Sequence, residues 1–249
     1  MTPFNLSKTE FVAYLECPLK FYLIKSANQG ETFGPRGERD YSSFPAAIKE
    51  GMKWHAWFER FHENYYARIS AGKPPLVTWD SKEARICKLF YEHELKRFQE
   101  EPEYWHPLAT ELYLQTDSFR GTIDRIDQLN ARGDCCIIEY KKEKGLFDEQ
   151  ELLFYATLLA EIDKETIGLQ AETRVKAIGT YYYSTGEFLT REVTEEEIRT
   201  FRSYLVNLKV EMLQRNWRKK EHCDEQPKQC LYYPICKRIP EELLFIKRS

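Results

Sequence analysis

The chain has 249 residues, of which 42% are hydrophobic and 31% are charged, and its formal net charge is −3. This composition excludes a disordered chain, and the length predicts one compact domain of the size of an enzyme. The net charge excludes a generally basic coat for nucleic acid but is compatible with a local basic groove. The longest apolar run, near Leu152 to Ala160, is too short to span a membrane, and the first residues resemble no signal peptide, so we expect a cytoplasmic protein without membrane contact.

The N-terminal third of the chain has helical patterns. A capping box that begins at Ser7 predicts a helix, which we expect to break near Pro18. The polar segment 30–43 predicts a loop, followed by a helix from about Pro45 to Ile69 and another over about 81–100. The core stripe of the helix after the loop is aromatic: Trp54, Trp57, Phe58, Phe61 and Tyr65.

The middle of the chain changes to extended patterns. Runs over 109–116, 119–129 and 135–141 predict an antiparallel meander, and a helix over 149–162 follows it. A hairpin over 175–193 comes next. A second capping box at Thr194 to Glu197 then opens a helix that should extend to about Trp217.

One group of residues in the meander combines two acids with a lysine. Glu139 and Lys141 lie two apart in a predicted strand, so their side chains share a face, and Asp124 can join them from the preceding strand. Carboxylates that bind Mg or Mn, together with a cation near the nucleophile, are what phosphodiester hydrolysis requires. An isolated E-x-K pattern is usually surface charge, but apolar residues flank Asp124 and Glu139. Asp127 is three residues past Asp124 and should point to the opposite face.

The cysteines fall into two classes. Cys17 stands alone near the start, whereas three others lie in polar sequence after the last helix: Cys223, Cys230 and Cys236. Four thiolates can hold a 4Fe-4S cluster or zinc, and their spacing does not separate the two metals. The remaining cysteines lie in apolar surroundings, where we expect core packing: Cys87, Cys135 and Cys136.

The run GTIDRID followed by IIEYKK resembles motifs II and III of RecB-like PD-(D/E)xK nucleases. This resemblance implies an α/β, restriction-endonuclease-like fold with a mixed central sheet flanked by helices. It also implies that Asp124, Glu139 and Lys141 are catalytic with Mg or Mn. The segment GMKWHAWFE resembles the family's G-x-x-x-H-x-x-F-E pattern and implies that His55 is a metal ligand; His62 lacks this context and is the weaker candidate.

A Q-x-x-x-Y motif of the same family implies a substrate-side role for Tyr155 and for a glutamine one turn before it. Gln150 is the glutamine in this segment, but counting back from Tyr155 puts Glu151 at the expected position. A shift by one residue would let Gln150 serve; otherwise Glu151 makes the contact by different chemistry. The pattern is equally compatible with Tyr155 as a core aromatic residue.

The cysteine pattern resembles that of the iron-sulfur members of the family. CPLKFY at Cys17 is similar to C-P-x-x-F/Y, and the spacing from Cys230 to Cys236 is similar to the family's final C-x5-C. The resemblance implies that a 4Fe-4S cluster on Cys17, Cys223, Cys230 and Cys236 joins the terminal segments. Pro227 occupies the position of one expected cysteine, so Cys223 would reach in from a longer loop, with His222 as an alternative ligand.

The resemblance extends from Cys17 to Cys236 and is nearest to stand-alone CRISPR-associated exonucleases. It implies one domain over 1–249, with a helical region over residues 1–107, a nuclease core over 108–217 and a cysteine-rich segment over 218–249. The implied substrate is single-stranded DNA or DNA ends, and the implied partners are a CRISPR integrase or repair proteins. Basic stretches at 141–144 and 215–220 suit phosphate contacts. The alternatives are a noncatalytic nucleic-acid-binding module and a zinc-stabilised DNA-binding protein.

Overall fold

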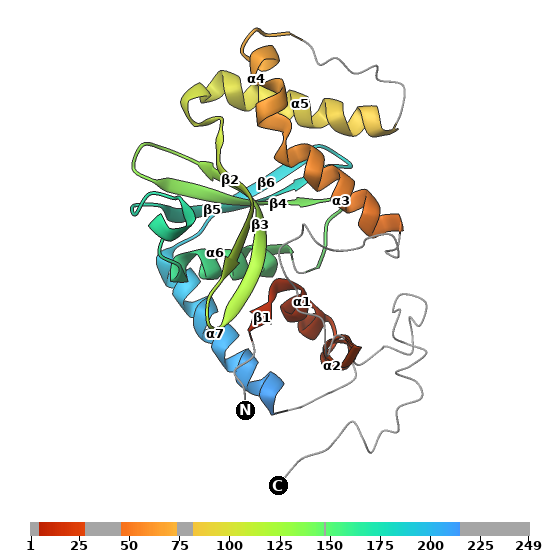
Figure 1. Cartoon of the computed structure of the whole chain (residues 1–249), viewed down its shortest axis with the longest axis vertical. Helices are drawn as coiled ribbons and strands as arrows, with labels where there is room; N and C mark the ends of the chain where they lie inside the picture. The colour runs from red at the N-terminus through yellow and green to blue at the C-terminus, as the bar shows by residue number, and fades with distance from the viewer. Residues whose placement is uncertain (1–4, 28–45, 74–81, 147, 215–249) are drawn as a thin grey trace.

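The computed structural model describes residues 5–27, 46–73, 82–146 and 148–214. Its centre is a mixed six-stranded sheet in the order β1-β3-β4-β5-β6, with β2 paired to β3. Helices cover both faces of this sheet (Figure 1), as the sequence predicts. The strands are β1 (Leu6–Ser7), β2 (Pro107–Gln115), β3 (Phe119–Gln128), β4 (Asp134–Lys141), β5 (Arg174–Tyr182) and β6 (Glu187–Glu192).

The predicted helix break near Pro18 is confirmed. Helix α1 (Lys8–Glu16) starts at the Ser7 cap, where both hydrogen bonds of the capping box form, and α2 (Pro18–Ala27) follows at once. Proline has no N–H and its ring restricts the preceding residue, so Cys17 is extended and ends α1. Cys17 therefore lies at the corner between the two helices.

The helix predicted from about Pro45 to Ile69 is two helices, so this prediction is wrong in its continuity. Helix α3 (Ala46–Glu59) ends at Arg60, whose backbone adopts φ −89° and ψ 0°, and α4 (Phe61–Ile69) begins after it. Phe58 and Phe61 flank the break and are both fully buried in the same cluster. The aromatic pattern therefore continues through the break and conceals it. Helix α5 (Lys82–Glu100) agrees with its prediction, and a short turn, η2 (Pro102–Tyr104), leads into β2.

The sheet separates two hydrophobic cores. One core packs α3, α4 and α5 against the face that carries Ile138 and Tyr140. The other packs α1, α6 (Asp148–Glu161) and α7 (Glu195–Leu213) against the face that carries Ile126 and Ile137. Because successive strand residues point to opposite faces, β4 contributes to both cores in alternation. Cys135 and Cys136 are buried, one in each core, and Cys87 is partly buried against the α3–α5 core, as predicted.

The connections between strands also agree with the sequence patterns. β2, β3 and β4 form the predicted antiparallel meander, and β5 and β6 form the predicted hairpin. β4 and β5 are parallel neighbours, which the crossover through α6 and the turn η3 (Glu165–Ile167) makes possible. No helix within the described residues is long and apolar enough to cross a membrane.

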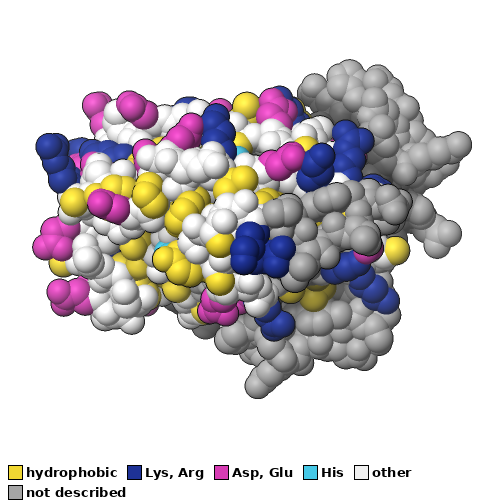
Figure 2. Space-filling model, turned by 90° about the horizontal axis from the view of Figure 1, so that it is seen from above, with side chains coloured by type: hydrophobic (Ala, Val, Ile, Leu, Met, Phe, Trp, Pro, Cys, Tyr) yellow, Lys and Arg dark blue, Asp and Glu magenta, His cyan; other side chains and the backbone are white. Residues whose placement is uncertain are grey.

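The face seen in Figure 2 carries basic, acidic and apolar side chains next to one another. Among the described residues on this face, the basic side chains do not gather into a continuous coat. This mixture agrees with a formal net charge of −3.

Candidate active site

Three acidic residues lie in one row across the meander. The register of β2 with β3 places Glu111 opposite Asp124, and the register of β3 with β4 places Glu139 on the other side of Asp124. Residues directly opposite each other in antiparallel strands have Cβ atoms about 4.5–5.5 Å apart. The row therefore concentrates three carboxylates at the centre of the sheet, where Asp124 and Glu139 are buried.

The β3–β4 ladder ends at this row. The last paired residues are Arg125 and Ile138, and beyond them the Tyr140 N–H donates to Asp124 Oδ2 at 2.9 Å. A side-chain oxygen thus takes the place of a backbone carbonyl as the acceptor for this strand. The backbone of β4 consequently fixes the orientation of the Asp124 carboxylate.

Glu111 has an unusual backbone conformation within its strand. Its φ is +48°. Among the described residues, no other residue except glycine has a positive φ. Such a conformation is rare for a residue with a Cβ atom and persists where the surroundings impose it. In this conformation Glu111 Oε1 lies 3.3 Å from His55 Nδ1.

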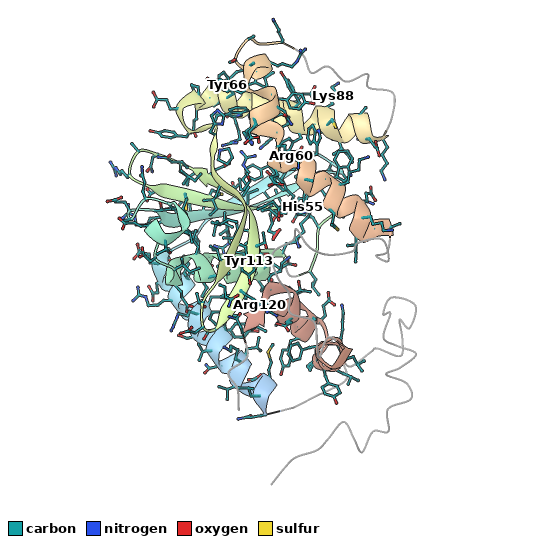
Figure 3. All side chains as sticks on the ribbon, viewed as in Figure 1. His55, Arg60, Tyr66, Lys88, Tyr113 and Arg120 are labelled. Carbon is teal, nitrogen blue, oxygen red and sulfur yellow. The ribbon has the colours of Figure 1, made fainter. Side chains whose placement is uncertain are left out.

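His55 brings a nitrogen ligand to the acids from a helix that packs on the sheet. In Figure 3 it lies between α3 and the crossing strands, whereas Arg60 and Tyr66 lie farther along the helices. Its Nδ1 is 3.1 Å from Asp124 Oδ1, and its ring packs edge-on against Tyr140 with centroids 5.8 Å apart. The aromatic stripe of α3 holds the helix on the sheet, which sets the position of His55.

The donors of His55, Glu111 and Asp124 fit a divalent cation. One ligand atom from each lies within 4.8 Å of the other two. Among the described residues, these three form the group of His, Cys, Asp or Glu side chains that could hold a metal ion. Neighbouring ligands of an octahedral Mg²⁺ or Mn²⁺, at about 2.1 Å from the ion, would be about 3.0 Å apart. The separations of 3.1 and 3.3 Å from Nδ1 to the two carboxylates are close to this geometry. Oxygen ligands suit both ions, and the imidazole suits Mn²⁺ better.

Because these ionisable side chains lie close together and are buried, their pKa values are shifted. Burial lowers the pKa of His55, but the Asp124 charge and hydrogen bonds to Asp124 and Glu111 raise it more, to about 10. Burial and the Asp124 charge raise the pKa of Glu139 to about 8. Burial opposes ionisation of Asp124 as well, but His55 holds the pKa of Asp124 well below its usual range. A cation would compete with a proton for His55 and Glu139, so its binding would release protons from these two groups.

A second group in the site contains lysines. Lys141 Nζ lies 2.5 Å from Glu151 Oε2, and Lys8 Nζ lies 2.8 Å from the same oxygen and 3.7 Å from Glu139 Oε1. The structure brings Glu151, rather than Gln150, into contact with Lys141. The reason is helical register: Glu151 and Tyr155 are four apart on α6 and share the face that packs on the sheet.

Tyr155 is buried beneath this group. Its ring lies 5.7 Å from Lys8 Nζ, in a cation–π geometry. A Cβ atom on Gly121 would come within 2.8 Å of the Tyr155 ring, which explains why a glycine precedes Thr122 in β3. Tyr155 therefore contributes to the core and lies next to the Lys8 ammonium.

The two weaker metal candidates, His62 and Asp127, belong to a separate buried network on the opposite face. Glu94 on α5 lies at its centre, with Arg125 Nη1 at 2.7 Å and His62 Nε2 at 3.0 Å. Asp127 Oδ1 lies 2.6 Å from Arg125 Nε, and Arg97 contacts both Glu94 and Asp127 at 2.9 Å. This network joins α4 and α5 to β3 next to Asp124.

The sequence interpretation did not include Glu111 or Lys8. Counting along the hairpin would have found Glu111, because the pairing of Gln115 with Arg120 puts it opposite Asp124. Nothing in the local pattern around Lys8 distinguishes it from a surface lysine at the start of a helix. Its place follows from the pairing of β1 with β3, which joins distant segments of the chain.

The comparison with protein families agrees with this geometry. The family model described as the PD-(D/E)XK nuclease superfamily matches residues 5–237, which include all of the strands and every residue of the site. Among curated proteins, none matches the chain. The match covers most of the sequence, so the chain belongs to the PD-(D/E)XK nuclease superfamily.

Proposed function

We propose that the protein is a divalent-metal-dependent deoxyribonuclease whose active site is the row of acids around Asp124. The observation that carries this proposal is the convergence of His55, Glu111 and Asp124 donors, within 4.8 Å of one another, beside Glu139 and Lys141. His55 and Glu111 both keep some solvent access, so a cation can reach their ligand atoms. Membership of the superfamily supports hydrolysis of nucleic acid.

In this proposal each residue has a separate task. His55, Glu111 and Asp124 would hold the cation, and Glu139 would complete its coordination. When bound, the cation supplies the positive charge that polarises the phosphate and activates water. Tyr140 orients Asp124 through its N–H, and Lys141 would supply a positive charge to the developing negative charge on the phosphate.

Removing the imidazole should weaken metal binding. We expect His55→Ala to raise the dissociation constant for Mn²⁺ by at least about tenfold, because loss of groups that merely orient ligands already costs 10–100-fold. Titration calorimetry with Mn²⁺ measures this directly. His106→Ala provides the matched control, because His106 is exposed and packs against Tyr66 and Trp105. Unchanged affinity in His55→Ala would exclude His55 as a ligand.

We propose single-stranded DNA or DNA ends as the substrate, within CRISPR spacer processing or DNA repair. The resemblance of the GTIDRID and IIEYKK segments to RecB-like nucleases supports this, and it supports a CRISPR integrase or a repair protein as the partner. The test is anaerobic incubation with Mn²⁺ and DNA labelled at either end, compared with circular single strands and a metal-free control. Cleavage of linear but not circular DNA supports an exonuclease, and equal cleavage of both contradicts it.

We further propose a 4Fe-4S cluster that joins the two terminal segments. Cys17 lies at the α1–α2 corner, while Cys223, Cys230 and Cys236 lie outside the described residues. The neighbouring structure supports the proposal, because Lys209 near the end of α7 donates to Ser118 O at 3.1 Å. Ser118 O in turn accepts from the Leu6 N–H, so the end of α7 and the strand before α1 meet at the start of β3.

Loss of Cys17 should therefore remove the cluster but leave the residues of the proposed active site in place. We expect Cys17→Ser, purified anaerobically, to lose the visible absorbance of the cluster and to unfold at a lower temperature. Cys87→Ser should keep both properties, since Cys87 only packs against the α3–α5 core. Iron and zinc analysis of the same samples distinguishes a cluster from a zinc site. Normal absorbance in Cys17→Ser would remove Cys17 from the ligand set.

A further inference from the structure

Lys8 brings a second ammonium group to the acids from a distant segment of the chain. It is the first residue of α1, and the residue that it contacts, Glu151, is 143 positions later. Its Nζ lies 2.8 Å from Glu151 Oε2 and 3.7 Å from Glu139 Oε1. Two elements that pack on one face of the sheet, α1 and α6, thus meet at the proposed active site.

The backbone around Lys8 is held firmly in place. The Ser7 N–H and hydroxyl both donate to Glu10 Oε2, at 2.8 and 2.9 Å, which closes the capping box. On the preceding side, β1 pairs with the first residues of β3. Because the capping box and the β1–β3 pairing both hold Ser7, the backbone that carries Lys8 is already ordered before a ligand binds, which lowers the entropy lost on binding.

The two lysines remain accessible while the carboxylate between them does not. The side chains of Lys8 and Lys141 are 23% and 22% exposed, whereas that of Glu151 is 8% exposed. Each ammonium has three N–H donors, and Glu151 Oε2 accepts a hydrogen bond from each lysine. Donors on both lysines therefore remain for an anion that approaches from solvent.

We propose that Lys8 is a second substrate-binding lysine, which contacts a DNA phosphate beside the one cleaved, and that Glu151 holds Lys8 and Lys141 side by side. This inference rests on the proposed nuclease function and extends it. A competing explanation is that Lys8 only attaches α1 to α6 through Glu151. The two explanations differ in whether loss of the Lys8 charge removes a phosphate contact.

The test compares DNA binding by Lys8→Gln, Glu151→Gln and wild type, using a labelled single-stranded oligonucleotide in EDTA over a range of salt concentrations. Glutamine at position 8 keeps a donor toward Glu151 but removes the charge. We expect Lys8→Gln to reduce the slope of log K against log salt by about 0.7, the value for one contact with a single strand. Glu151→Gln should not reduce the slope, because both lysines remain. Lys8→Arg should restore it.

Lys88→Gln is the matched control, because Lys88 is also paired with a carboxylate, Glu92, and lies on α5 far from His55 in Figure 3. Its slope should equal that of wild type. A wild-type slope in Lys8→Gln and in Lys8→Met would overturn the inference and leave Lys8 as a docking residue. Binding in EDTA requires no cleavage, so failure of wild type to cleave DNA with Mn²⁺ refutes the nuclease proposal separately.

Discussion

Asp124→Asn and Glu139→Gln should each reduce Mn²⁺-dependent DNA cleavage by at least about a hundredfold, the upper range for losing a group that merely orients a ligand. Both substitutions keep the volume of the side chain and remove its negative charge. The amide oxygen of an asparagine at position 124 can still accept the Tyr140 N–H, so the β3–β4 junction should be retained. Initial rates on end-labelled DNA, with thermal unfolding as a check of folding, measure the effect.

Asp117→Asn is the control for these variants. Asp117 lies exposed in the turn between β2 and β3, in the same hairpin as Asp124, so the Asp117→Asn protein should cleave DNA at the wild-type rate.

Lys141→Met should lose cleavage while metal binding remains, because Lys141 contacts Glu151 rather than the metal-site donors. Full activity in Glu139→Gln would show that the row of acids is not the active site.

Glu94→Gln should destabilise the fold by about 3–5 kcal/mol, the range for removing one partner of a buried ion pair. Glu94 is fully buried and contacts Arg125, Arg97 and His62, which come from three different elements. Glutamine would leave the buried Arg125 guanidinium with Asp127 but without its second carboxylate partner. The free energy of unfolding from urea denaturation measures the loss, and Glu92→Gln on the exposed face of α5 should change it by less than about 0.5 kcal/mol.

Protonation of the Glu94 carboxylate should also be visible in how the free energy of unfolding changes with pH. Burial raises the pKa of Glu94, but Arg125 and His62 lower it more, to about 2, against an ordinary value of 4.5. Because the folded pKa is depressed, this contribution is present above about pH 4.5 and is lost as the pH falls toward 2. The wild type should lose stability over this interval, and Glu94→Gln should lose less. Equal acid sensitivity of the two proteins would contradict the role of Glu94.

From the sequence it was possible to predict those site residues whose side chains alternate regularly along a strand. Asp124, Glu139 and Lys141 share one face because strand residues alternate, and this alternation is regular at all three positions. Glu111 could have been placed by counting along the β2–β3 hairpin, but nothing in the sequence indicates its positive φ, which is rare for a residue with a Cβ atom. Lys8 depends on strand pairing over a long separation, which no local pattern encodes.

Helix boundaries, too, could be predicted only where a local sequence signal marks them. The capping boxes at Ser7 and Thr194 predicted two helix starts correctly, because the signal and the structure lie within the same four residues. The break at Arg60 has no such signal, since both helices bury their aromatic residues in one cluster. For α6, helical register from Tyr155 already favoured Glu151, and the contact with Lys141 agrees with that count.

The contact between Lys8 and Glu151 has a consequence for synthesis of the chain on the ribosome. Glu151 is made 143 positions after its partner Lys8, which at about 5–20 residues per second is a delay on the order of ten seconds. The acids on β2, β3 and β4 belong to one meander and need only local loop closures to assemble. The nascent chain can therefore form its carboxylate row before the N-terminal segment docks, and the contact between Lys8 and Glu151, which joins distant segments, forms later.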